Sequence, residues 1–238
     1  MKKIALLTLG LLLTICSFGQ TIENEERTIE SFDKISVNSV IKVELFKSTS
    51  RELEIYTENI PTDKIIVKVK NGKLSLDLVT RKKGWNDIEV KVRVPYQHLS
   101  KISGHIASLI WSDEKIESDE LEIYLGEASK GELDITCNEL AVNLNSAGRL
   151  KLEGNCKKLD ANINSAAKLN AYKLKVIDAD IVANSMGTAK VNVKSNLDIN
   201  ASSMAKVTYM GEPTNLHKSK SSMASIRQVS HNLQEIKN

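Results

Sequence analysis

The C-terminal half of the chain repeats one pattern of apolar and polar positions at a nearly constant interval. A tetrapeptide of small residues opens each repeat, and successive copies begin 19, 20, 18 and 19 residues apart, at Asn145, Asn164, Asn184, Ser202 and Ser221. A degenerate earlier copy begins at Gly126. Two runs of alternating apolar and polar residues follow each tetrapeptide, and a period of two is typical of a strand with one buried face. The pattern therefore predicts two short β-strands per repeat.

Two short strands cannot bury a core alone, and stacking successive repeats solves this problem. The repeats therefore predict a parallel β-solenoid (a β-helix) with about 19 residues per coil and coils about 4.8 Å apart. We expect the tetrapeptides to form corners, with their small Ala or Met packed inward and their Asn and Ser side chains hydrogen-bonded along the stack. We also expect two inward-facing ladders, one of Leu150, Leu169, Ala189 and Val207 and the other of Leu159, Ile177 and Leu197.

The first part of the chain has a different pattern. Short alternating runs follow one another between residues 35 and 94, and Asn71-Gly72 separates two of them. An Asn-Gly pair between alternating runs is the strongest short-range signal for a β-hairpin. The fold class is therefore all-β, without a helix of useful length. We expect a mainly antiparallel β layer over residues 20–100, the solenoid over residues 101–230 and a C-terminal tail over residues 231–238.

The N-terminus is typical of a secretory signal peptide. Lys2 and Lys3 precede an apolar run, and small residues come shortly before Gln20. We expect residues 1–19 to be removed by cleavage before Gln20, and lipid attachment at Cys16 is the alternative. The apolar run is shorter than the roughly 20 residues that a membrane-spanning helix needs. The mature chain is therefore expected to have no transmembrane span and to be exported to the periplasm, the outer-membrane surface or the outside of the cell.

Charge and motif content narrow the classes of function. The chain has 33 Lys and Arg against 30 Asp and Glu, and two of the lysines lie in the signal peptide. This near balance argues against a dedicated nucleic-acid binder, which usually has a strongly basic domain. The four histidines lack metal-ligand spacing, and neither a phosphate-binding glycine loop nor a nucleophile elbow occurs. We therefore expect no cofactor, no metal and no catalytic residue.

One polar loop between the predicted strands is the first candidate for partner binding. It contains Arg81, Lys82, Lys83 and Trp85. An aromatic ring flanked by cations in a loop can stack on a sugar or dock against a partner. Packing of the ring onto the β layer is the alternative.

The two cysteines of the mature chain form a second candidate feature. Cys137 and Cys156 are 19 residues apart, so they should occupy the same position in adjacent coils. Stacked positions lie within the Cα range that a disulfide tolerates, and an exported compartment permits oxidation. A disulfide and a pair of reduced packing residues are both compatible with this spacing.

Recurring acids on the second strand of the repeat form a third candidate feature. Asp160, Asp178, Asp180 and Asp198 should face solvent in a row with Asn162. Like charges stacked at the coil spacing repel each other and could create a cation site. The alternative is a solvated face relieved by nearby lysines.

Several short stretches of the chain resemble a known bacterial family. The similarity also includes the repeated Ser-Ala and Ser-Met turns, and the stretches are residues 32–37, 41–45, 71–76, 90–95 and Ile102-Ser103-Gly104. They are similar to the "head GIN domain" family of auto-transporter adhesins, which is common in Bacteroidetes. The resemblance implies an exported β-helical protein and gives no catalytic residues to transfer.

The sequence therefore favours a non-catalytic, adhesin-like interaction module at the cell envelope, with an unknown protein or glycan as its partner. The alternative is a carbohydrate-active enzyme, a polysaccharide lyase or hydrolase, because such enzymes need convergent acids on one face of a β-helix. The acid row would then supply those groups. A third hypothesis is end-to-end assembly through the terminal coils.

Overall fold

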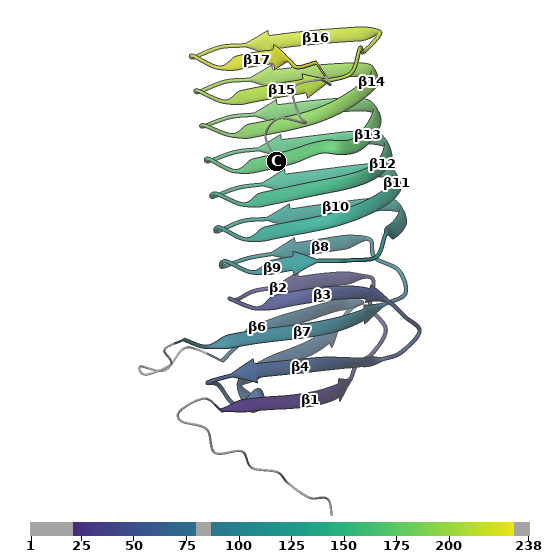
Figure 1. Cartoon of the computed structure of the whole chain (residues 1–238), viewed down its shortest axis with the longest axis vertical. Helices are drawn as coiled ribbons and strands as arrows, with labels where there is room; N and C mark the ends of the chain where they lie inside the picture. Colours follow the sequence, from purple (N-terminus) through teal and green to yellow (C-terminus); the bar gives the residue numbers. More distant parts are fainter. Residues whose placement is uncertain (1–20, 80–86, 231–238) are drawn as a thin grey trace, which may run out of the picture.

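The computed structural model describes residues 21–79 and 87–230, which form a tall stack of β-coils (Figure 1). Strands of the repeats pair in parallel with their counterparts one coil further on. The solenoid has about seven turns about 19 residues apart, so the predicted all-β solenoid is confirmed. Its strands are β10 (Ile116–Leu125), β11 (Lys130–Leu144), β12 (Arg149–Ile163), β13 (Lys168–Ala183), β14 (Thr188–Ala201), β15 (Lys206–Met210), β16 (Asn215–Lys220) and β17 (Ser225–Gln228).

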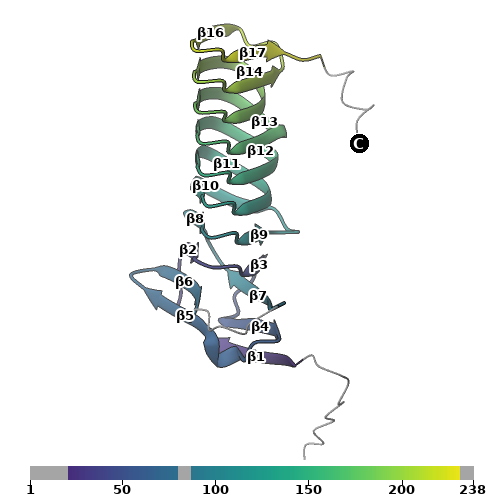
Figure 2. The same cartoon turned by 90° about the vertical axis from the view of Figure 1, so that its left-hand side faces the viewer.

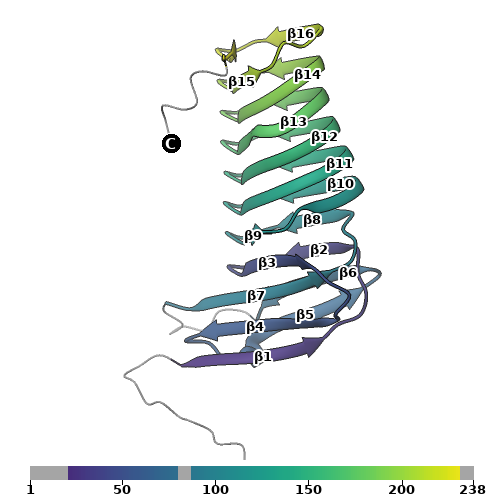
Figure 3. The same cartoon turned by 45° about the vertical axis from the view of Figure 1, so that its right-hand side comes forward.

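Each long strand bends once, and the bend divides its coil between two sheets. The first half of β14 pairs with β15, for example, and its second half pairs with β16. We call the sheet of first halves the front sheet and the sheet of second halves the back sheet (Figures 2 and 3). The tetrapeptides connect the sheets at one edge of the stack, the turn edge, and the strand bends connect them at the opposite edge, the bend edge. Side chains that point between the sheets form the core.

The N-terminal strands join the same stack out of sequence order. A coil of β2 and β3 pairs in parallel with β6 and β7 on one side and with β8 and β9 on the other. Antiparallel pairs, β1 with β4, β4 with β7 and β5 with β6, extend the stack at its N-terminal end. The expected antiparallel layer is therefore present. The bounds are β1 (Ile22–Thr28), β2 (Lys34–Val37), β3 (Lys42–Lys47), β4 (Glu52–Glu58), the 3-10 helix η1 (Thr62–Lys64), β5 (Ile65–Lys70), β6 (Lys73–Leu78), β7 (Glu89–Tyr96), β8 (Lys101–Gly104) and β9 (Leu109–Trp111).

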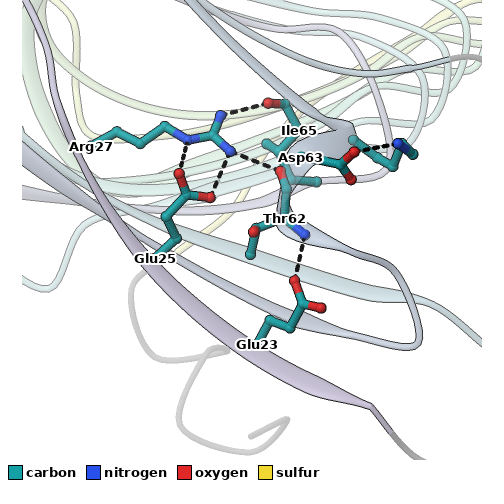
Figure 4. A network of polar contacts seen from close by, with 7 residues as sticks. Glu23, Glu25, Arg27, Thr62, Asp63 and Ile65 are labelled. Atoms are coloured by element: carbon teal, nitrogen blue, oxygen red, sulfur yellow. Dashed lines mark hydrogen bonds and ion pairs between the residues drawn. The ribbon is translucent and has the colours of Figure 1, made fainter. Parts of the chain in front are cut away.

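A polar network ties the outermost strand, β1, to this layer (Figure 4). Arg27 forms an ion pair with Glu25 at 2.7 Å and donates hydrogen bonds to the backbone oxygens of Thr62 and Ile65 at 2.8 and 2.6 Å. The hydrogen bond and charge of Arg27 lower the pKa of Glu25 to about 2, so the pair stays ionised into acidic solution. The network connects β1 to η1 and β5, and in this way it closes the N-terminal end of the stack.

The first of the two predicted ladders is confirmed. Leu150, Leu169, Ala189 and Val207 are successive register partners in the front sheet, and all four are buried. Their column continues through successive coils because the parallel pairing places equivalent residues above one another.

The second predicted ladder is wrong at one position. Leu159 pairs with Ala179 and Ala179 pairs with Leu197, whereas the side chain of Ile177 points outward and is 42% exposed. The coil of β13 contains one more residue than the coil of β12, and the register shifts near Tyr172 absorb it. At the bend, two successive side chains point outward in each coil, Lys157 and Lys158 in β12 and Ile177 and Asp178 in β13, so the inward partner of Leu159 is Ala179.

The tetrapeptide turns bury a different residue from the one predicted. Their second and third residues have positive φ, +49° at Ser185 and +64° at Met186, and the N–H of Gly187 donates to the carbonyl of Asn184 at 2.8 Å. This is type I′ geometry. It directs the third residue outward and the fourth inward, so Met186 is exposed and Gly187 is buried. The prediction that the Ala or Met of the tetrapeptide packs inward is therefore wrong.

A buried charge should distinguish two isoleucines whose local patterns look alike. Ile163 of β12 is fully buried and Ile177 of β13 is exposed. The substitution Ile163→Asp should lower the free energy of unfolding by about 4 kcal/mol, because an unpaired carboxylate would enter the core. The matched control Ile177→Asp should change it by less than about 0.5 kcal/mol. Urea unfolding followed by circular dichroism measures both, and equal losses would contradict the register described.

Candidate functional site

The polar loop that the sequence suggests for partner binding lies outside the described residues. This applies to Arg81, Lys82, Lys83 and Trp85. In sequence the loop connects β6 to β7. Its role in binding stays a prediction.

A groove of about 640 Å³ runs along the bend edge of the stack and crosses the coils of β10 to β14. Its floor is formed by short side chains at register-equivalent positions, Ser118, Cys137, Cys156 and Val176. Three of these floor residues point into the core while the side chains on both sides point outward, and this difference in direction creates the groove. One side contains Glu117, Thr136, Asn155 and Lys175, and the other contains Asp119, Asn138, Lys157, Ile177 and Lys194.

The charge of this bend-edge groove changes sign along its length. Glu117 and Asp119 lie on β10 at one end, whereas Lys157, Lys175 and Lys194 lie on β12, β13 and β14 toward the other end, the basic end. Within the described part of the chain, none of the three lysines has a carboxylate within ion-pair distance. The basic end is therefore available to an anionic ligand.

Ile177 adds exposed apolar surface among these lysines. Lys175 precedes it by two residues on the same strand, and Lys157 and Lys194 come from the coils on either side. Ile177 points outward because it holds the same position at the bend as Lys157 in the preceding coil. The lysines recur at intervals of 18 and 19 residues, close to the length of one coil. This interval is the feature of the sequence that could have indicated a basic site at this edge.

Cys137 and Cys156 lie on the groove floor as register partners in adjacent coils. Both are free and buried, and their Sγ atoms are 3.3 Å apart. The hydrogen bond between the two sulfurs and the burial of the pair raise the pKa of the Cys137 thiol. The stacking inferred from their spacing is therefore present, and their oxidation to a disulfide stays a prediction.

Three of the four aspartates in the predicted acid row are stacked on the back sheet. Asp160 and Asp180 are register partners on adjacent strands, and so are Asp180 and Asp198. Asp178 lies in the neighbouring column, where its register partner is Lys158. Partial burial and the charges of Asp198 and Asp160 raise the pKa of Asp180. Asp180 therefore lies between two like charges along the stack, and this arrangement is electrostatically unfavourable.

Neither a metal cluster nor a membrane-spanning helix occurs in the described residues. In residues 21–79 and 87–230, no three His, Cys, Asp or Glu side chains are grouped closely enough to hold a metal ion. The same residues contain no helix with the length and apolar character needed to cross a bilayer.

A stack of parallel coils with a lateral groove defines a β-solenoid protein that presents an elongated surface. The chain belongs to the family described as "Putative auto-transporter adhesin, head GIN domain", whose profile matches residues 31–213. The family supports a non-catalytic, adhesin-like module. No curated protein matches the chain.

Solved structures from Bacteroidetes share this fold. A "putative adhesin" from Bacteroides fragilis aligns with a TM-score of 0.74 and 21% identity over 88% of this chain and 97% of that one. A "putative adhesin" from Parabacteroides merdae aligns with a TM-score of 0.70 and 15% identity, covering 87% and 96%. A "Putative lipid binding protein" from Parabacteroides distasonis gives 0.67 and 18%, covering 87% and 96%. At these identities the similarity establishes the fold.

Removing the central charge of the acid row should stabilise the protein. At neutral pH, Asp180→Asn should raise the free energy of unfolding by about 0.3 kcal/mol, because stacked like charges destabilise a sheet and exposure to solvent weakens the effect. The pKa of Asp180 is raised above 3.8 in the folded state. Protonation of Asp180 therefore stabilises the wild-type protein relative to the variant as the pH falls through that raised pKa, and the advantage of the variant disappears. Thermal melts between neutral and acidic pH test this, and a gain independent of pH would contradict the charge mechanism.

Mild oxidation should join Cys137 and Cys156 without moving the coils. Their sulfurs already face each other at 3.3 Å, and register partners lie within the Cα range of a disulfide. After treatment of the reduced, folded protein with oxidised glutathione, mass spectrometry should find a cross-linked peptide containing both residues. Two reactive thiols in the unfolded, oxidant-treated mature chain would refute the bridge.

Proposed function

We propose that this protein is an exported, adhesin-like binding module of the cell envelope, and that its bend-edge groove binds an extended acidic glycan. The observation that carries the proposal is the groove with three lysines at one end and no opposing carboxylate within ion-pair distance among the described residues. The signal-like N-terminus supports export. The family supports an adhesin-like role.

The sides of the groove carry groups that suit sugars. Thr136, Asn138 and Asn155 offer hydroxyl and amide groups that can both donate to and accept from sugar hydroxyls. Ile177, which is 42% exposed, offers apolar surface to the C–H face of a sugar ring. Ligand-binding sites typically combine apolar surface with a small number of polar groups that fix the orientation of the ligand.

The basic end supplies the preference for an acidic ligand. Lys157, Lys175 and Lys194 are compact charges on flexible stems, and such charges attract a carboxylate or sulfate without requiring one fixed geometry. Their field extends over about 8 Å at physiological salt. Successive coils about 4.8 Å apart can meet successive units of an extended sugar chain, because such units repeat at a similar interval.

An enzymatic role has one feature in its favour. A depression of about 560 Å³ on the back sheet is lined by residues that include Asp178, Asp180, Asp198 and His217. Glycoside hydrolysis requires two carboxylates on opposite sides of the scissile bond, whereas Asp180 and Asp198 lie in one column on one surface. Turnover of an acidic polysaccharide that is abolished by Asp180→Asn would favour the enzyme.

Neutralising the basic end should weaken binding to acidic glycans. On an array of acidic and neutral glycans, the wild-type protein should bind acidic chains. The triple variant with Gln at Lys157, Lys175 and Lys194 should bind at least tenfold more weakly, a loss of about 1.4 kcal/mol. Binding should also weaken steeply as the salt concentration rises.

A second triple variant provides the matched control. Gln at Lys130, Lys168 and Lys206 changes the net charge equally, but these lysines lie in one outward column of the front sheet beside the turn edge. This variant should bind acidic glycans as the wild type does. A loss in the control variant alone would overturn the groove as the site. Binding to anionic vesicles in place of glycans would overturn the ligand class.

A further inference from the structure

Three exposed methionines lie one above another at the turn edge. Met186, Met204 and Met223 hold the third position of successive tetrapeptides and are 56%, 54% and 84% exposed. The N–H of Met186 donates to the carbonyl of Ser203, and that of Met204 donates to the carbonyl of Ser222, both at 2.9 Å. The three side chains therefore leave the stack from equivalent backbone positions in adjacent coils. We call them the methionine row.

Packing does not explain the methionine row. Its φ angles are +64°, +63° and +61°, and this left-handed region costs a residue with a Cβ about 1 kcal/mol. Ala147 and Ala166 hold the same position in the preceding turns with the same backbone conformation. Met210, by contrast, is a buried core residue. The row therefore places three large apolar side chains in solvent where alanine also fits.

We propose that the methionine row binds one soft monovalent metal ion, Cu(I) or Ag(I), through its three thioether sulfurs. Thioethers are soft, neutral ligands that select Cu(I), whereas Ca²⁺ and Mg²⁺ prefer oxygen ligands. A single positive charge also limits the repulsion from Lys206, which follows Met204 by two residues. The proposal is independent of the glycan groove, because the row and the groove lie at opposite edges of the stack.

The geometry allows the three sulfurs to converge on one ion. Successive turns are about 4.8 Å apart, and each methionine has three rotatable bonds and a polarisable sulfur. Met204 is one coil away from each of the other two, so an ion beside its sulfur is within reach of both neighbours. The hydrogen-bonded turns hold the three Cα atoms in place before the ion arrives, and such preorganisation lowers the entropic cost of binding.

Silver ions and methionine methyl signals give a direct test. The full chain is labelled with ¹³C at the methionine methyl groups, and its three cysteines are replaced by alanine so that no thiol competes. Addition of Ag(I) should shift the signals of Met186, Met204 and Met223 together and saturate at one ion per chain. The signal of buried Met210 should not move. Zn²⁺ at the same concentration should shift none of these signals.

Leucine variants separate sulfur chemistry from apolar contact. Met204→Leu should weaken Ag(I) binding at least tenfold, because it removes the central sulfur and keeps the apolar volume. Leucine at all three positions should abolish the one-to-one step, and Met210→Leu is the matched control that should retain it. Circular dichroism should show all variants folded, since the row is exposed and a Met-to-Leu exchange conserves volume at buried Met210. Independent shifts that saturate only at three ions per chain, or unchanged affinity in the triple variant, would overturn the site.

Discussion

Parallel pairing between successive coils is the constraint on which the rest of this structure depends. Two short strands per repeat cannot form a core, so each coil relies on the coils above and below it for backbone hydrogen bonds and apolar contacts. Pairing in register converts every position of the repeat into a column of equivalent residues. Residues of the same type therefore become neighbours along a column: Cys137 lies beside Cys156, and Asp180 lies between Asp160 and Asp198. The protein's candidate sites are consequences of these columns.

The turns show how strongly the stack determines local conformation. In seven described turns the second and third residues have positive φ, and none of these residues is glycine. Type I′ turns normally use Asn and Gly at these positions because other residues are strained there. Here each turn is also hydrogen-bonded to the next, as Ala147 is to Ser165 at 3.0 Å. Strain of this kind persists where the surroundings determine the conformation from several directions.

The sequence predicts the fold better than it predicts the surface. Apolar alternation at a 19-residue interval is enough to predict the solenoid, because only inward columns must be apolar. The outward surface depends on the bends, where two successive side chains point outward and interrupt the alternation: Ile177 and Asp178 both lie outside, and Ala179 is the next inward residue. The direction of the tetrapeptide residues depends on turn type, and Ser-Met at positive φ is not an expected signal for a type I′ turn. The groove lies at the bend, where inward Cys156 is followed by outward Lys157, and the alternating pattern does not reveal where the bend falls.

The coil of β2 and β3 has a consequence for how the chain folds. Its strands are complete early in the sequence, but Lys34 pairs with both Lys73 and Lys101, and Lys42 pairs with Leu109. The coil of β2 and β3 can therefore pair only with segments that lie far along the chain. Each later coil pairs with a neighbour that is only one repeat away in sequence. Contacts of high sequence separation form slowly because loop closure must precede them. We therefore expect the C-terminal repeats to form a template first, and the N-terminal strands to be incorporated last, although they emerge first during synthesis.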